Sequence, residues 1–254
     1  MMEIKVAECC GFCYGVKRAV SMAQKAAGHI RGGTLGPLIH NPQLIGELAQ
    51  QGIACKESLD QFSPGETVIF RSHGVGPETY AEAEQKGLQI LDATCPNVRL
   101  AQKKAAQAAA DGYFPVIVGE KNHPEVKSIL KWAGKNAICV ECIKDISDVP
   151  QQERYGVIIQ TTFELQKFED ILQAMQEQRP GEYRVERTIC LATAQRQKAA
   201  VKLASESDAV VVIGGRNSAN TRHLFELVQE HCGKAYHIET AGELRSDMFR
   251  GCHK

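Results

Sequence analysis

The chain has 254 residues, of which 43% are hydrophobic and 24% are charged, so it can bury a sizeable core. Lysine plus arginine and aspartate plus glutamate number 30 each, and the net charge is zero. Nucleic-acid-binding proteins usually carry a basic surplus, and membrane-surface proteins a basic amphipathic helix, so the composition favours neither class and fits a small-molecule ligand better.

The chain starts without the apolar stretch of a signal peptide, and no run of about 18 apolar residues appears in it. We therefore expect a cytoplasmic protein that does not enter the membrane. In that reducing compartment, ten cysteines indicate metal or redox chemistry rather than disulfides. They stand at positions 9, 10, 13, 55, 95, 139, 142, 190, 232 and 252.

Apolar spacing and turn residues predict alternating strands and helices. Residues 4–7 alternate like a strand, and the apolar residues from Val16 onward follow helical spacing. Asn41-Pro42 is typical of a helix start, and Gly52 follows the end of that helix. We predict further strands at residues 67–70, 88–91, 115–118, 157–160 and 209–213. We predict further helices at residues 77–86, 96–110, 124–133, 164–178, 193–205 and 221–231. This alternation predicts an α/β fold with parallel sheets covered by helices.

Cys13, Cys95 and Cys190 each stand where a predicted strand leads into a helix. Their spacing divides the chain into pieces of comparable size, which we interpret as three small α/β domains: residues 14–95, residues 96–190, and residues 191–254 together with 1–13. A helix N-terminus favours the thiolate that binds metal. Three such thiolates could meet at one iron–sulfur cluster and leave one iron open for substrate. The alternative is three buried cysteines that only pack strand ends, which we consider weaker for three in one setting.

Three histidines, His40, His73 and His123, each follow a predicted strand and precede a helix. In parallel sheets that edge binds ligands, and imidazoles together with helix N-termini can hold a phosphate. The other histidines lack this setting, so we expect surface or capping roles for them. They stand at positions 29, 223, 231, 237 and 253.

Glu125 stands two residues after His123, in the first turn of a predicted helix. Helix capping alone would explain an acid there. Beside a redox centre, the same carboxyl could supply a proton while His123 and Thr161 order a substrate hydroxyl. Residues 214–220, a glycine–asparagine–serine loop after the strand at 209–213, suit an oxyanion such as phosphate. They match neither a Walker motif nor a dinucleotide fingerprint.

Taken together, these segments are similar to the LytB/IspH family of 4-hydroxy-3-methylbut-2-enyl diphosphate reductases. The similarity runs from the first predicted strand to the end of the chain. The matching motifs, in order, are Gly11-Phe12-Cys13-Tyr14-Gly15-Val16, His40-Asn41, Ser72-His73-Gly74-Val75, Asp92-Ala93-Thr94-Cys95-Pro96, His123-Pro124-Glu125, Gln160-Thr161-Thr162, Ile189-Cys190 with Ala192-Thr193 and Arg196-Gln197, and Asn217-Ser218 with Asn220.

The resemblance implies a trefoil of three α/β domains around an oxygen-sensitive 4Fe–4S cluster held by Cys13, Cys95 and Cys190. It implies that two electrons, from ferredoxin or flavodoxin, and protons remove the hydroxyl group of the isoprenoid diphosphate as water. The products would be isopentenyl and dimethylallyl diphosphates, at the end of the methylerythritol phosphate pathway. The family's catalytic and substrate-binding positions fall on Glu125 (the acid), His123 and Thr161 (the hydroxyl end), and His40, His73, Ser218 and Asn220 (the diphosphate).

The resemblance also carries departures. Family members continue past the position of Lys254 into a further strand and an Ala-Gly-Ala-Ser loop that contacts the diphosphate. We therefore expect a third domain without its last strand–helix unit, and the activity of this chain is left open. Ala219 replaces a serine that is frequent in the family, and Cys9 and Cys10 are additional thiols beside Cys13.

A different class of function is a zinc-stabilised binding module. Cys10 and Cys13, and likewise Cys139 and Cys142, have a spacing known from structural zinc sites. The long separation of the two pairs argues against a compact zinc finger. A thioredoxin-like role for Cys10 and Cys13 is a weaker alternative, because no strand–helix unit precedes them.

Overall fold

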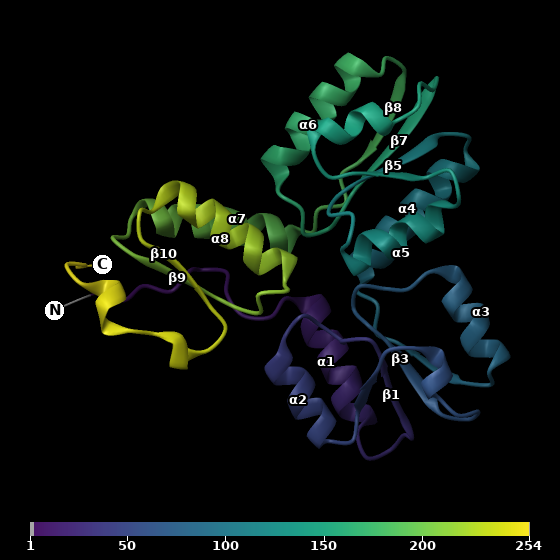
Figure 1. Cartoon of the computed structure of the whole chain (residues 1–254), viewed down its shortest axis with the longest axis horizontal. Coiled ribbons are helices and arrows are strands. Elements are labelled where there is room, and N and C mark those ends of the chain that lie inside the picture. The colour runs from purple at the N-terminus through teal and green to yellow at the C-terminus, as the bar shows by residue number, and fades with distance from the viewer. Residues whose placement is uncertain (1–2, 254) are drawn as a thin grey trace. The chain divides into compact units, whose positions relative to one another are not determined.

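A computed structural model describes residues 3–253 of the chain (Figure 1). Its internal contacts divide it into two compact units, which we describe separately. Unit 1 contains Met1–Phe12, His40–Pro42 and Cys190–Lys254. Unit 2 contains Cys13–Ile39 and Gln43–Ile189. No helix within the described residues is long and apolar enough to cross a membrane.

The first sheet of unit 2 has four parallel strands in the order β2-β1-β3-β4. Its strands are β1 (Gly32–Leu35), β2 (Ala54–Lys56), β3 (Thr67–Phe70) and β4 (Gln89–Asp92). The helices around it are α1 (Tyr14–Ala26), α2 (Pro42–Gln50), α3 (Pro77–Gln85) and the short η1 (Leu59–Gln61). One apolar cluster joins the sheet to α1 and α2, and a second joins it to η1 and α3. The sheet is therefore buried on both faces, as parallel sheets usually are.

The second sheet of unit 2 repeats this topology, with the order β6-β5-β7-β8. Its strands are β5 (Phe114–Val118), β6 (Ile138–Val140), β7 (Arg154–Ile159) and β8 (Glu182–Glu186). Its helices are α4 (Pro96–Ala110), α5 (Pro124–Ala133), α6 (Leu165–Gln178) and the short η2 (Ile143–Asp148). Alanines of α4 pack closely on one face, while α6 and η2 cover the other. All four strands end at the same edge, where His123 and Thr161 follow β5 and β7.

Unit 1 contains a smaller sheet of two parallel strands, β9 (Val210–Ile213) and β10 (Ala235–Ile238). Two long helices, α7 (Leu191–Ser205) and α8 (Ala219–His231), pack on each other and on this sheet. Two short helices follow β10, namely η3 (Ala241–Glu243) and η4 (Ser246–Phe249). Ile213 is 67% exposed, because within residues 3–253 β9 has a neighbouring strand on one side only.

The predicted α/β class with parallel sheets is confirmed. The helices at residues 96–110 and 124–133 begin and end as predicted. One predicted strand is wrong: residues 4–7 form no strand, and Ile4 and Val6 are 80% and 73% exposed. Alternation alone does not make a strand where no partner strand supplies hydrogen bonds.

Several strands were not predicted, namely β1, β2, β6, β8 and β10. They are short or polar: β1 reads Gly-Gly-Thr-Leu and β8 reads Glu-Tyr-Arg-Val-Glu. Such segments become strands through pairing with an apolar neighbour rather than through their own composition. The expected division into domains at residues 14–95, 96–190 and 191–254 plus 1–13 stays a prediction.

Candidate functional site

Two of the three predicted cluster cysteines lie in unit 2, each as the residue before a helix. Cys13 is the N-cap of α1, and Cys95 is the N-cap of α4. Burial raises the pKa of Cys95; the nearby amides of Asn97 and Val98 oppose this rise, and the charge of Cys13 adds to it. Repulsion between two thiolates opposes their deprotonation together, and a positively charged centre between them would offset it. The pair therefore fits a metal centre.

Gly15 makes room for the Cys95 sulfur. A Cβ atom on Gly15 would lie 2.4 Å from Cys95 Sγ, so any larger residue would displace that sulfur. Arg18, one turn further along α1, donates from Nη1 to the carbonyl oxygen of Thr94 at 3.1 Å. The first turn of α1 and the residues just before α4 are thus fitted to each other around the two cysteines.

Glu125 is the most perturbed acid of the site. It lies in the first turn of α5, is 2% exposed, and accepts hydrogen bonds from Thr161 N at 2.6 Å and Thr161 Oγ1 at 2.9 Å. Burial raises the pKa of Glu125 from its ordinary 4.5 to about 7, although both bonds from Thr161 lower it. A carboxyl that gains and loses its proton near neutral pH is suited to general acid catalysis.

His123 is the N-cap of α5, and its Nδ1 accepts a hydrogen bond from Glu125 N at 3.1 Å. When the ring is neutral, its proton is therefore on Nε2. The ring of His73 approaches the ring of His123 edge to face, with centroids 5.5 Å apart. Unit 2 thus brings His73, His123, Glu125 and Thr161 close together.

Cys190 lies in unit 1 as the N-cap of α7. Its sulfur accepts a hydrogen bond from Thr193 N at 3.3 Å and lies 3.1 Å from Thr193 Oγ1. The sulfur thus lies at the N-terminal, positive end of the α7 helix dipole. All three predicted cysteines are thus helix N-caps, a position that suits a thiolate ligand.

The glycine–serine–asparagine loop of unit 1 leads from β9 into α8. Ser218 is the N-cap of α8, and its Oγ accepts from Thr221 N at 3.3 Å, which leaves its hydroxyl proton free to donate to an anion. Asn220 lies in the first turn, where the helix dipole favours negative ligands. The carbonyl oxygen of His40 lies beside this loop, 2.4 Å from where a Cβ on Gly215 would be. His40, Ser218 and Asn220 are therefore neighbours within unit 1.

The Cys139 and Cys142 pair of the zinc alternative does not resemble a metal site. Burial raises the pKa of Cys139 to about 12, and its sulfur donates to the carbonyl oxygen of Gly119 at 3.2 Å. A thiol that stays protonated is a poor zinc ligand. Cys142 caps η2 instead, with its backbone N–H bonded to Asp145 at 3.0 Å.

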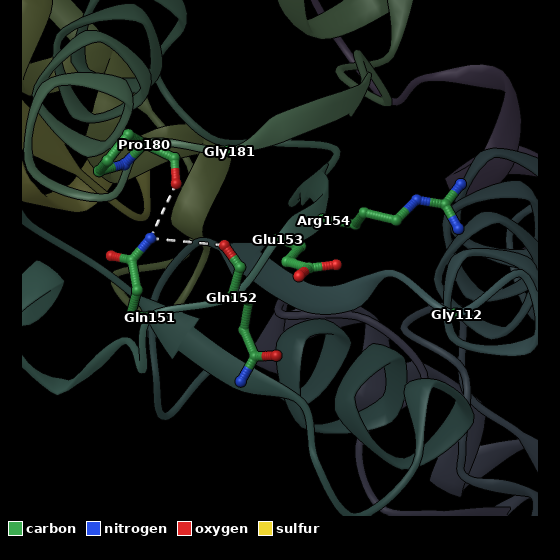
Figure 2. Close-up of a pocket in the computed structure, with 7 residues that line it drawn as sticks. All are labelled: Gly112, Gln151, Gln152, Glu153, Arg154, Pro180 and Gly181. Atoms are coloured by element: carbon green, nitrogen blue, oxygen red, sulfur yellow. Dashed lines mark hydrogen bonds between the residues drawn. The ribbon is translucent and has the colours of Figure 1, made fainter.

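A shallow hollow of about 730 Å³ lies at the edge where β7 and β8 begin (Figure 2). Gln151 lines it and donates to the carbonyl oxygen of Pro180 at 2.8 Å. Thr161 follows the opposite end of β7, so this hollow is remote from the acid. Its lining consists of Gly112, Gln151, Gln152, Glu153, Arg154, Pro180 and Gly181, without a cysteine or a histidine.

Sequence reasoning gave no role to Gln160, although it belongs to a quoted motif. Gln160 is fully buried, accepts from Glu120 N at 2.9 Å and donates to Thr162 Oγ1 at 3.0 Å, so it fixes the backbone beside Thr161. The sequence feature that could have indicated this role is a glutamine at the end of an otherwise apolar strand. His223, expected at the surface or in a cap, is instead buried on α8.

Parallel α/β units, cysteines at helix N-caps and a buried acid beside histidines define a class of metal-dependent α/β enzymes for small anionic substrates. The family model for "LytB protein" matches residues 4–254, and the chain belongs to this family. The family implies an iron–sulfur cofactor and an oxidoreductase of isoprenoid biosynthesis.

Curated relatives carry the name 4-hydroxy-3-methylbut-2-enyl diphosphate reductase. The protein of Aquifex aeolicus is 42% identical over 256 residues, which cover 99% of this chain and 88% of the relative. The protein of Pelobacter propionicus is 44% identical over 253 residues, which cover 98% of this chain and 89% of the relative.

Two solved structures are similar over nearly the whole chain. A structure of (E)-4-hydroxy-3-methyl-but-2-enyl diphosphate reductase, described as the terminal enzyme of the non-mevalonate pathway, is 41% identical with a TM-score of 0.73, and covers 100% of this chain and 91% of its own. The reductase from Plasmodium falciparum is 25% identical with a TM-score of 0.88, and covers 96% of this chain and 78% of its own.

Proposed function

We propose that this chain reduces 4-hydroxy-3-methylbut-2-enyl diphosphate to isopentenyl and dimethylallyl diphosphates in the cytoplasm. The observation that carries the proposal is the buried carboxyl of Glu125, whose pKa is about 7 and which lies between Thr161 and the N-cap His123. Named relatives at 42% and 44% identity support the same activity.

The cofactor in this proposal is a 4Fe–4S cluster held by Cys13, Cys95 and Cys190. The donor set fits, because each cysteine stands at a helix N-terminus and Gly15 leaves space for the Cys95 sulfur. When bound, the cluster supplies electrons and Lewis acidity at the hydroxyl end of the substrate. The three domains at residues 14–95, 96–190 and 191–254 plus 1–13 would each contribute one cysteine.

The protein's own residues bind the substrate and supply a proton. His40, His73, Ser218 and Asn220 offer N–H and O–H donors for the diphosphate. Thr161 and His123 order the hydroxyl group, and the protonated Glu125 donates to it as the C–O bond breaks. Two electrons and two protons convert the C–OH group into C–H and one water molecule. Ferredoxin or flavodoxin is the proposed electron donor.

Anaerobic purification and analysis for iron and sulfide test the proposal. We expect a brown protein with about four irons per chain and formation of both products with a chemical reductant. Cys13→Ser, Cys95→Ser and Cys190→Ser should each lose the visible band, whereas Cys139→Ser should keep it. Bound zinc without iron or sulfide would refute the reductase and favour the zinc module.

A further inference from the structure

The carbonyl oxygen of Val75 accepts hydrogen bonds from side chains of α5. Trp132 Nε1 donates at 2.9 Å, and Ser128 Oγ donates at 3.4 Å. Gln102, on α4, donates to Ser128 Oγ at 2.5 Å and lies 3.5 Å from the same carbonyl oxygen. Val75 follows β3 of the first sheet, whereas both helices flank the second sheet. The three side chains thus join the loop after β3 to the helices of the neighbouring sheet.

This loop carries His73, and α5 carries His123 at its N-cap. Glu125, Ser128 and Trp132 are spaced by three and four residues, so they lie along one face of α5. The bonds to Val75 therefore set the position of His73 relative to the helix that carries the acid. At the other end of the same face, the rings of His73 and His123 are in contact.

The loop is fixed at its other end as well. Ser72 donates from its amide and its hydroxyl to Leu38 O, at 3.1 and 3.0 Å, and accepts from Cys95 N at 2.9 Å. Between the two ends, Gly74 has a φ of 75°, and a Cβ on it would lie 2.3 Å from Gln102 Nε2. The loop is therefore packed against Gln102, with no space for a side chain at position 74.

Burial of Gln102 lowers the stability of the folded protein. Gln102 is 1% exposed, and its Oε1 is buried without a hydrogen-bond partner among residues 3–253. A buried oxygen without a partner reduces stability, and an apolar side chain of similar size would avoid that cost. The benefit of the glutamine therefore lies in what its amide N–H group holds, namely Ser128 and the Val75 carbonyl.

We propose that Gln102, Ser128 and Trp132 are positioning residues that hold His73 in the geometry required to bind the diphosphate. The role of His73 in this statement rests on the proposed function. The three residues touch no substrate and act through the Val75 carbonyl.

The test measures the Kd of inorganic pyrophosphate by calorimetry on the anaerobically purified chain. Trp132→Phe keeps the ring but removes the N–H donor, and should weaken binding about fivefold, as expected for one neutral hydrogen bond. Gln102→Leu should weaken binding similarly while the midpoint of denaturant unfolding stays the same or rises. Tyr183→Phe is the matched control: it removes a donor to Arg179 O at 2.7 Å, remote from the loop, and should leave the Kd unchanged.

A double-mutant cycle shows whether the effect passes through His73. With His73→Ala already present, Trp132→Phe should weaken binding no further. An equal weakening in both backgrounds, or unchanged binding by Trp132→Phe alone, would overturn the positioning role.

Failure of the proposed function gives a different result. If wild type and His73→Ala bind pyrophosphate equally, or neither binds it, His73 is not a diphosphate ligand. NMR of the histidine ring nitrogens then decides the positioning role by itself. Trp132→Phe should shift the signals of His73 while Tyr183→Phe leaves them in place, and signals of His73 unchanged in both variants would refute it.

Discussion

Burial of Glu125 destabilises its ionised carboxylate and thereby gives the residue a pKa suited to proton donation. The first turn of α5 would suit an ionised acid, because the helix dipole stabilises negative charge there. Burial outweighs this effect and both hydrogen bonds from Thr161, so the pKa is about 7 instead of 4.5. The same carboxyl in an exposed first turn would be ionised at neutral pH and unable to donate a proton.

The raised pKa predicts a pH dependence of folding stability. The folded protein holds a proton on Glu125 up to about pH 7, whereas the unfolded chain releases it near pH 4.5, so this residue lowers the free energy of unfolding as pH rises between these values. The total loss is on the order of 3 kcal/mol. Denaturant unfolding of wild type and Glu125→Gln from pH 4 to 8 measures it. As pH rises, the free energy of unfolding of wild type should fall relative to that of Glu125→Gln. A difference between the two proteins that does not vary with pH would contradict the raised pKa of Glu125.

The helix starts are the elements that organise the site. Cys13, Cys95, His123, Cys190 and Ser218 are the N-caps of five different helices. An N-cap residue leaves the helix end accessible while its side chain lies near unpaired backbone N–H groups. Sulfur, imidazole and hydroxyl groups at these places therefore lie in an electropositive environment.

Two glycines inside helices give a matched prediction at this level. Gly15→Ala on α1 places a methyl group 2.4 Å from Cys95 Sγ, which should rotate that thiol away at little cost in stability but reduce iron content and the visible band at least about tenfold. Gly46→Ala on α2 has no atom within 4 Å of the new methyl group and should stabilise the protein by about 0.5–1 kcal/mol with iron content unchanged. Equal iron content in both variants would show that Gly15 is unrelated to the metal site.

Within the described chain, the three sheets differ in how fully their strands are paired. β1, β3, β5 and β7 have neighbours on both sides, whereas β9 has only β10. The exposed side chains of Ile4, Val6 and Ile213 all belong to unit 1, and its apolar cluster is the smallest. We therefore expect unit 1 to be the less stable unit.

Hydrogen exchange should show this difference within a single strand. The amides of Val210 and Gly214 donate to Lys234 and Ile238 of the β10 side at 2.9 Å each, so by alternation those of Val211 and Ile213 face the open edge. Amide exchange followed by NMR should be fast at Val211 and Ile213, slower at Val210 and Gly214, and slowest in β5 and β7. Slow exchange at Val211 and Ile213 would mean that another strand covers this edge.

The sequence by itself determined the local features. Prolines at positions 96 and 124 placed the starts of α4 and α5, and the setting of the cysteines and histidines indicated a metal and phosphate site, because capping and turn chemistry depend on neighbouring residues. Other features depended on partners far along the chain, so only the tertiary structure decided them. These are the absence of a strand at residues 4–7, the burial of His223 and the contact of Trp132 with Val75. The pKa of Glu125 belongs to the second group, since desolvation is a property of the packed environment and not of the residue.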